Sequence, residues 1–386
     1  MSRARALIAG AGIGGLAAGI ALRREGLEAQ VFERARELRE VGAALLIWPN
    51  GTNALQALGV EPRMLTVKKQ SMLDWHGRHL LDAPVSSLLA RHGSEMAFVH
   101  RADLQAGLLK AFGDDSLRLN AEVTGFVDGA NHVEVTLKGG GRVEGDLLVG
   151  ADGLRSAVRS QLLGDGEPTY LGVTVWRGIA SADGIPIEAG HGLDWIGRGA
   201  EFLAFHLADS RIYWAGVTKE PQGAPPGPGG HKHDLAARFG GWQKPVPELI
   251  AATDEAAILR NDMYDRRPAR SWSRGRVTLL GDAAHPMTPN AGQGACQALE
   301  DAVALGECLS IAADTAGAFR CYEARRLKRA NRMVEVSHQI GDAVQLENPL
   351  LCALRDGCAR VMPASIQLRM MDAIVDNPRP DAVGRA

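Results

Sequence analysis

The stretch Gly10-Ala-Gly-Ile-Gly-Gly15 decides the fold of this 386-residue chain. An apolar run at residues 5–9 leads into it, and a helical pattern from Leu16 to Arg24 follows it. A second apolar run, from Ala29 to Phe32, resumes after that helix. Strand, glycine turn, helix and strand in this order predict a βαβ unit, whose two strands lie parallel.

The glycines match the G-x-G-x-x-G pattern through Gly10, Gly12 and Gly15. Gly10 permits the tight turn, Gly12 lets the backbone approach a pyrophosphate, and Gly15 lets the helix pack closely on the strand. The free N–H groups of the helix favour negative charge there. Glu33, at the end of the second strand, can accept hydrogen bonds from a ribose, and its carboxylate would repel a 2′-phosphate. The turn therefore predicts FAD or NAD, without deciding between them.

Composition excludes several other classes of protein. The chain is 46% hydrophobic and 23% charged, with a formal net charge of -2. This balance supplies no basic field for nucleic acid and no lysine cluster for an anionic membrane. No apolar run approaches the roughly 18 to 20 residues of a membrane span, and glycines interrupt the N-terminal run where a secretory signal needs a helical core. We expect a cytoplasmic protein with no nucleic-acid partner and no membrane span.

Cysteine and histidine usage predicts neither a disulfide framework nor a metal site. The cysteines are odd in number and have no C-x-x-C spacing, which favours reduced thiols. His231 and His233 follow a Pro/Gly-rich loop at Pro221–Gly230, where two isolated histidines are more often solvent-facing than bound to a metal. The five cysteines are Cys296, Cys308, Cys321, Cys352 and Cys358.

Two later stretches have the same strand–turn–helix character. Gly150-Ala-Asp-Gly153 follows a predicted strand from Asp146 to Val149 and precedes a short helical pattern. Gly281-Asp282 follows the run Val277 to Leu280, and the turn Gly292-Gln-Gly-Ala295 then opens another helix. Both stretches resemble ligand-binding strand ends.

These later stretches favour FAD over NAD. Asp282, just beyond a strand end, is well placed to hold a polyol. The N–H groups of the helix that Gly294 opens can stabilise a developing anion. NAD has no polyol and gains nothing from a second helix N-terminus far along the chain. A long cofactor held at both ends therefore fits better.

With three motifs in this order and spacing, the chain resembles the single-component FAD-dependent aromatic hydroxylases, the para-hydroxybenzoate hydroxylase-like group A flavoprotein monooxygenases. The resemblance runs from the N-terminal glycines to about residue 310. Trp48-Pro-Asn-Gly51 looks most like the branch of urate hydroxylases and zeaxanthin epoxidases, and also resembles salicylate- and hydroxynicotinate-type hydroxylases. Cys296, which stands where many members have asparagine, contributes to this resemblance, and the spread of the resembling enzymes leaves the substrate open.

The resemblance implies a set of FAD-binding positions. Glu33 would bind the adenosine ribose, Arg101 would touch the cofactor, and Asp282 would hold the ribityl and pyrophosphate region. The turn at 292–295 would lie against the flavin ring, and the stretch at 152–153 belongs to a motif linked to both FAD and the nicotinamide cofactor. The full set is Gly10, Gly12, Ile13, Gly14, Gly15, Glu33, Arg34, Ala44, Arg101, Val123, Asp152, Gly153, Asp282, Pro289, Gly292, Gly294 and Ala295.

The resemblance also implies an activity. NADH or NADPH would bind transiently and reduce FAD, O2 would add to the reduced flavin at C4a, and the hydroperoxide would transfer one oxygen to a small aromatic or heteroaromatic ring. The organic chemistry belongs to the flavin, while the protein excludes water and orients the substrate. Epoxidation, Baeyer–Villiger insertion and a flavin oxidase or dehydrogenase stay open as alternatives. The substrate, the choice of nicotinamide cofactor and the choice between monomer and homodimer do not follow from the sequence.

Residues 166–270 have a pattern typical of strands, with candidate strands at 171–180, 201–207 and 211–217. We therefore predict an α/β fold: a discontinuous Rossmann-type FAD-binding domain, an inserted β-sheet substrate domain and C-terminal helices. The predicted FAD domain comprises 1–70, 96–165 and 271–330, the substrate domain 71–95 and 166–270, and the C-terminal helical region 331–386.

The β-rich insert supplies the candidates for catalysis. A phenolic substrate reacts better as phenolate, so a nearby base would help. Tyr213 and His206 are candidates for this role, and Arg177 is a candidate anion clamp. On a strand, Tyr213 shares a face with Arg211 and Ala215, and this face either points into a cavity or lies on the surface of a sheet. His206 has the same two alternatives.

Overall fold

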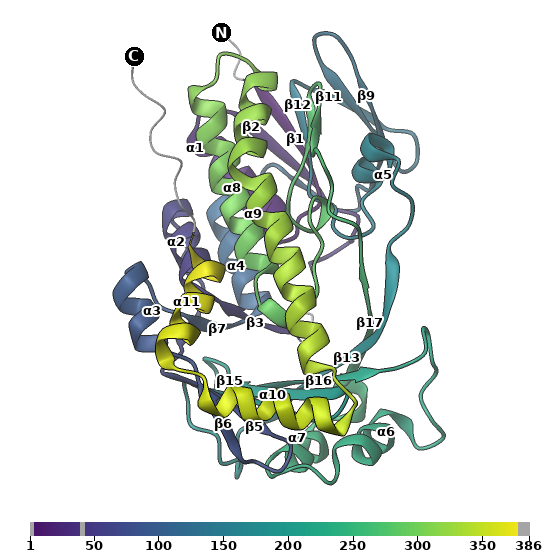
Figure 1. The fold of residues 1–386 in the computed structure, drawn as a ribbon. Helices are drawn as coiled ribbons and strands as arrows, with labels where there is room; N and C mark the ends of the chain where they lie inside the picture. Colours follow the sequence, from purple (N-terminus) through teal and green to yellow (C-terminus); the bar gives the residue numbers. More distant parts are fainter. Residues whose placement is uncertain (1–3, 39–42, 377–386) are drawn as a thin grey trace.

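The computed structural model describes residues 4–38 and 43–376. The ends of the predicted FAD domain and C-terminal region, at 1–3 and 377–386, lie outside the described residues. The molecule is built around two large sheets, and a layer of long helices stands against the first of them (Figure 1). The predicted fold class is confirmed.

The first large sheet contains the predicted βαβ unit. β1 (Arg5–Ala9) lies between β2 (Glu28–Phe32) and β12 (Leu147–Gly150), and all three run parallel. The order across the sheet is β18-β19-β12-β1-β2-β8. Its remaining strands are β8 (Leu117–Arg118), β18 (Ser273–Arg274) and β19 (Val277–Leu279).

Helices cover one face of this sheet, and a smaller sheet lies beside the other. Figure 1 shows α1, α4, α8 and α9 standing side by side against the β1–β2 region. These helices span Ile13–Arg24, Arg101–Phe112, Gly294–Ile311 and Thr315–Val344. The smaller sheet comprises β9 (Val123–Asp128), β10 (Val133–Leu137) and β11 (Arg142–Gly145), next to α5 (Ala157–Leu163).

The second large sheet has the order β17-β13-β16-β15-β14-β5-β6. The three strands predicted here are present as β13, β15 and β16, whereas β5, β6, β14 and β17 carry no comparable pattern in the sequence. The strands span Lys69–Asp74 (β5), His79–Asp82 (β6), Thr169–Ser181 (β13), His191–Ile196 (β14), Ala200–His206 (β15), Arg211–Lys219 (β16) and Leu259–Asp265 (β17).

Alternate residues of the second sheet enter two different cores. Trp176 and Trp214 pack on one face with α6 (Gly230–Phe239) and α7 (Val246–Ala252). Tyr213 and Val217 face the other way and join the core of the first sheet. We call this second face the inner face, because it is directed toward the cofactor region.

The remaining elements connect and close these layers. β3, β4 and β7 form a three-stranded sheet, while α2 and α3 pack beside it and α10 and α11 form the C-terminal helices in Figure 1. Their bounds are Ala44–Ile47 (β3), Met64–Thr66 (β4), Ala97–His100 (β7), Pro49–Leu58 (α2), Val85–His92 (α3), Pro349–Val361 (α10) and Ala364–Val375 (α11). Single 3-10 turns are η1 (Glu255–Ala257), η2 (Gly281–Ala283) and η3 (Pro289–Ala291).

Two expectations from the sequence are wrong. Cys308 on α8 and Cys321 on α9 form a disulfide, with Cα atoms 5.8 Å apart. The two helices form a hairpin, so cysteines 13 residues apart face each other without any recognisable spacing motif. His231 and His233 lie in the first turn of α6 instead of on the loop; His233 is exposed as expected, whereas His231 is half-buried and packs edge-on against Trp176.

Candidate cofactor and substrate site

The glycine turn has the geometry that the motif predicts. Gly10 has a φ of 98°, and a Cβ there would lie 2.4 Å from the carbonyl oxygen of Ala151. A Cβ on Gly15 would lie 1.9 Å from the carbonyl oxygen of Gly10. At Gly12, the N-cap of α1, a Cβ would have no neighbour within 4 Å. Two glycines are therefore required by the fold, whereas the third keeps the helix N-terminus open to a ligand.

Glu33 lies directly beside this turn. Its carboxylate accepts hydrogen bonds from the backbone N–H of Ala11 at 2.8 Å and of Ala35 at 2.9 Å. Arg34 is exposed next to it, and the chain leading to Val123 bonds back to Glu33 through the N–H of Ala121. The acidic side chain thus links the glycine turn to the end of β2, where a ribose would lie.

The start of α4 lies on the other side of the turn. Gln105 donates from Nε2 to the carbonyl oxygen of Ala11 at 2.9 Å. Arg101 precedes Gln105 by four residues and therefore lies on the same helix face. Its backbone N–H donates to the carbonyl of Ala43, next to Ala44 on β3. Arg101 and Ala44 are thus brought to the glycine turn from separate parts of the chain.

The predicted Asp152–Gly153 stretch lies against Gly10. The carboxylate of Asp152 accepts from the hydroxyl of Ser156 at 2.5 Å and from the N–H of Ala157 at 2.8 Å. Burial raises the pKa of Asp152, and these hydrogen bonds offset only part of that rise. Because the side chain is engaged in capping α5, any contact with a cofactor would come from the backbone here.

Arg159, which is buried, connects this stretch to the third motif. Its guanidinium donates to the carbonyl oxygens of Ala283 at 3.0 Å and Ala284 at 2.8 Å, and it pairs with Asp165. The two distant motifs are therefore held in one fixed arrangement.

The third motif places Asp282 at the N-terminus of α8. Asp282 is exposed, and one of its carboxylate oxygens lies 3.9 Å from the position of a Cβ on Gly294. Gly292 has a φ of 62°, and a Cβ there would lie 3.0 Å from the indole nitrogen of Trp48. That indole N–H is buried and, among the described residues, has no hydrogen-bond partner. An unpaired donor beside an open helix N-terminus fits the polar edge of a flavin ring.

A buried polar network around Asp301 holds the Gly281 turn in place. Asp301 accepts from the N–H of Gly281 at 3.1 Å, from Nε2 of His285 at 2.5 Å and from Nε of Arg326 at 2.7 Å. Burial alone would raise the pKa of Asp301, but His285 and Arg326 outweigh it and lower that pKa to about 2. Arg326 also pairs with Glu300. The network fixes the Gly281 turn to α8 and α9.

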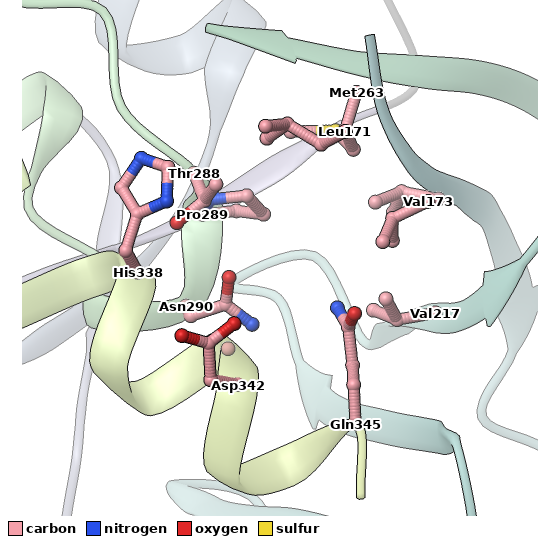
Figure 2. Close-up of a pocket in the computed structure, with 12 residues that line it drawn as sticks. Leu171, Val173, Val217, Met263, Thr288, Pro289, Asn290, His338, Asp342 and Gln345 are labelled. Atoms are coloured by element: carbon pink, nitrogen blue, oxygen red, sulfur yellow. The ribbon is translucent and has the colours of Figure 1, made fainter. Parts of the chain in front are cut away.

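A pocket of about 90 Å³ lies between the third motif and the inner face of the second sheet. Figure 2 shows apolar side chains of the sheet, including Val173 and Val217, across the pocket from Asn290 and Asp342. Pro289 and Asn290 come from the predicted flavin motif, so the pocket adjoins the cofactor position. Its lining residues are Leu171, Val173, Val175, Val217, Met263, Thr288, Pro289, Asn290, His338, Gly341, Asp342 and Gln345.

Helix α9 supplies the polar wall of this pocket, and none of its residues was singled out by motif. His338 pairs through Nε2 with a carboxylate oxygen of Asp265 at 2.5 Å. Ser337 donates to the carbonyl oxygen of Thr288 at 2.6 Å and so anchors the loop that precedes η3. His338, Asp342 and Gln345 recur at helical spacing. That polar stripe is the one signal that could have identified them.

The sequence candidates in the insert divide between the two faces of the second sheet. Tyr213 lies on the inner face, and Arg177 shares that face two register positions beyond Val175. Burial raises the pKa of Tyr213, and the neighbouring Arg177 offsets this only in part. His206 lies on the opposite face, where Nε2 contacts the carbonyl oxygen of Ile187 at 2.7 Å. The structure therefore brings Tyr213 and Arg177 together and keeps His206 apart, because neighbouring strand positions alternate in direction.

Fold and site together define an α/β protein with a dinucleotide-type glycine turn at Gly10–Gly15 and a second open helix N-terminus at Gly294. The chain belongs to the family whose model is described as "FAD binding domain", which matches residues 3–174 and 252–337. The predicted cofactor FAD, the family resemblance and the oxidoreductase class are thereby confirmed. No helix within residues 4–38 and 43–376 is long and apolar enough to cross a membrane.

Three similar proteins agree with this membership. The chain is 43% identical over 361 residues to aurachin C monooxygenase/isomerase of Stigmatella aurantiaca, covering 92% of this chain and 94% of that protein. It is 35% identical over 336 residues to the FAD-dependent urate hydroxylase of Klebsiella pneumoniae, covering 86% and 88%. The crystal structure of Klebsiella pneumoniae HpxO complexed with FAD and uric acid has a TM-score of 0.92 at 32% identity, covering 97% of both chains. The chain is thus a member of a FAD-dependent monooxygenase family.

Proposed function

We propose that this protein is an NAD(P)H-consuming monooxygenase that hydroxylates a small aromatic or heteroaromatic ring. The observation that carries the proposal is the pocket between Pro289–Asn290 and the inner sheet face. When bound, FAD supplies the oxygen chemistry, with NADH or NADPH as the reductant and O2 as the source of the inserted atom. The protein's own residues bind and orient the ring beside the flavin position.

The two walls of the pocket suit a planar ring that has polar substituents. Val173, Val175 and Val217 offer an apolar surface against which one face of a ring can pack. Asn290 and Gln345 offer amide donors and acceptors opposite that surface. These two walls together orient a substrate. Apolar contact holds the plane of the ring, and hydrogen bonds to its polar substituents determine which edge of the ring faces the flavin position.

His338 is our candidate for the group that accepts a proton from the substrate. Its imidazole lines the pocket, and the carboxylate of Asp265 on one ring nitrogen would orient the ring. Tyr213 lies on the same sheet face but outside the residues that line the pocket; its phenol is protonated at neutral pH and burial raises its pKa further, so we assign it as a hydrogen-bond donor beside the pocket. Arg177 would hold an anionic substituent at the same face.

The test is to purify the protein with FAD and follow NAD(P)H oxidation in air with phenols, hydroxylated N-heterocycles and purines. We expect one ring class to stimulate oxidation and one labelled oxygen atom from O2 to enter the product. Oxidation that produces only hydrogen peroxide with every ring would instead indicate an oxidase. Labelled epoxide or lactone products would indicate the other monooxygenase reactions.

The role of His338 is tested separately with His338→Gln. We expect kcat to fall by roughly tenfold to a hundredfold, because the substrate loses its proton acceptor. His92→Gln is the matched control, since His92 also pairs with an aspartate, Asp372, on α11. An unchanged kcat in His338→Gln would remove His338 from the mechanism.

A further inference from the structure

The C-terminal helix α11 is held to the protein mainly through its last turn. Figure 1 shows this helix at the surface of the molecule, beside α3. Val375 is buried, whereas most of residues 364–370 are exposed. The last carbonyl groups of a helix have no partner within the helix and must find donors elsewhere. The end of α11 therefore depends on other elements.

Arg329 on α9 supplies donors for these carbonyl groups. Its guanidinium donates from Nη2 to the carbonyl oxygens of Ile374 at 3.1 Å and Val375 at 3.2 Å, and from Nη1 to that of Asp376. The side chain is only 11% exposed. A cation is also favoured at this end of a helix dipole. One arginine thus caps α11 from a helix that lies earlier in the chain.

The same guanidinium holds Glu300 on α8. Arg329 donates from Nε to Oε2 of Glu300 at 2.9 Å and from Nη2 to Oε1 at 3.0 Å. Arg326 pairs with the same carboxylate. Burial alone would raise the pKa of Glu300, but Arg326 and Arg329 outweigh burial and lower that pKa. Glu300 is therefore ionised, and charge-assisted hydrogen bonds fix its position.

Asn50 connects Glu300 to the flavin turn. It belongs to the stretch Trp48–Gly51 at the start of α2, and its Nδ2 donates to Oε1 of Glu300 at 2.5 Å and to Oε1 of Gln293 at 3.0 Å. Gln293 donates back to Oδ1 of Asn50 at 3.3 Å. Both amides are buried, and Gln293 is the N-cap of α8 within the turn Gly292–Gly294. Polar contacts therefore run without a break from the end of α11 to this turn.

We propose that Arg329 is a positioning residue for FAD, which couples the last turn of α11 to the turn Gly292–Gly294. It acts through Glu300 and Asn50. This coupling needs only the FAD of the family shown above, whichever ring the enzyme hydroxylates.

Burial makes this connection sensitive to the position of each member. A buried polar group that loses a partner has no water to replace it, so each displacement has a cost in free energy. If the last turn of α11 moves away, Arg329 loses three carbonyl acceptors and its grip on Glu300 changes. Coupling between two sites is reciprocal for binding free energies. An anchored α11 should therefore favour FAD binding, and bound FAD should favour an anchored α11 by the same factor.

The experiment combines hydrogen–deuterium exchange of residues 364–376 with fluorescence titration of FAD. In the unchanged protein, we expect saturating FAD to slow exchange in α11 by about tenfold. Arg329→Lys keeps a positive charge beside Glu300, but one ammonium group cannot serve both the carboxylate and three carbonyl oxygens. We expect this variant to lose the slowing at saturating FAD and to bind FAD about tenfold more weakly.

Arg325→Lys is the matched control, because Arg325 also joins α9 to a glutamate of α8, the exposed Glu307. It should behave like the unchanged protein in both measurements. The proposal is wrong if FAD does not slow exchange in α11 of the unchanged protein. It is also wrong if Arg329→Lys changes only one of the two quantities or neither, or if Arg325→Lys changes both to the same extent. Neither measurement uses a ring substrate, so a failure of the proposed hydroxylation would be seen separately.

Discussion

The glycine turn and the substrate pocket are built in opposite ways. The turn draws on neighbouring residues, from Gly10 to Gly15 and Glu33, and its geometry comes from the backbone. The pocket draws on side chains from β13, β16, β17, the η3 loop and α9, which are separated by up to 174 positions between Leu171 and Gln345. A backbone site can be recognised from a short motif, whereas a side-chain site depends on the completed fold.

The two regions should also fail differently when mutated. In the turn, a methyl group added at Gly10 or Gly15 meets backbone atoms that cannot move. In the pocket, a changed side chain meets other side chains or solvent, so the fold survives and only the chemistry changes. The predictions below test this contrast.

The largest effect is expected for Gly15→Ala. The added Cβ would lie 1.9 Å from the carbonyl oxygen of Gly10, so strand and helix must separate. We expect a loss of about 4 kcal/mol or more in the free energy of unfolding, measured by urea denaturation, or no folded protein. Gly357→Ala is the control, because Gly357 lies within α10 and a Cβ there has no neighbour within 4 Å. It should stabilise the protein by up to about 1 kcal/mol. Equal stability of the two variants would contradict the assigned packing of α1 on β1.

Next in size is Asp301→Asn, which breaks the buried network below the flavin motif. The substitution leaves Arg326 with Glu300 but removes the charge that faces His285. Breaking one partner of a buried ion pair costs about 3–5 kcal/mol, and we expect a loss of this size in denaturation experiments. Asp372→Asn, in the partly exposed cluster with Arg91 and His92, should cost less than about 1 kcal/mol.

The same carboxylate gives a pH dependence. The pKa of Asp301 in the folded protein, about 2, lies below the ordinary value of 3.8. Its contribution is therefore complete above about pH 4 and is lost as the pH falls toward 2, amounting to roughly 2 kcal/mol. Urea denaturation at several pH values should show this loss in the unchanged protein and a smaller one in Asp301→Asn. Parallel curves for the two proteins would argue against the lowered pKa.

Gly12→Ala is expected to separate cofactor binding from folding. A Cβ at this position has no protein neighbour within 4 Å, so stability should change by no more than about 1 kcal/mol. The methyl group would stand at the N-terminus of α1, where the diphosphate approaches the backbone. We expect FAD affinity to fall by about a hundredfold, as measured by flavin fluorescence titration. Normal FAD affinity would mean that the diphosphate does not approach Gly12.

The sequence predicted the backbone-built parts of the molecule well. The βαβ unit, the three long strands of the second sheet and the helix opened at Gly294 all follow from local patterns. The sequence did not predict β5, whose parallel partner β14 lies more than a hundred residues away, or β6, which joins the sheet through β5. The disulfide between Cys308 and Cys321 depends on the register of two helices, and the place of His338 depends on a loop that Ser337 anchors. These features need the tertiary structure, because no short stretch of sequence contains both partners.

The smallest effect is expected from a pair of substitutions on the two faces of the second sheet. Tyr213→Phe removes a hydroxyl on the inner face, and we expect kcat/KM to fall by about tenfold, the value of one hydrogen bond to a bound ring. His206→Gln alters the opposite face, where the ring contacts the carbonyl oxygen of Ile187, and should cost about 1 kcal/mol of stability while kcat/KM stays unchanged. Steady-state kinetics and denaturation of both variants show which face of the second sheet contacts the substrate. A loss of turnover in His206→Gln with full activity in Tyr213→Phe would reverse the assignment of the inner face. The substrate would then have to lie against α6 and α7 instead.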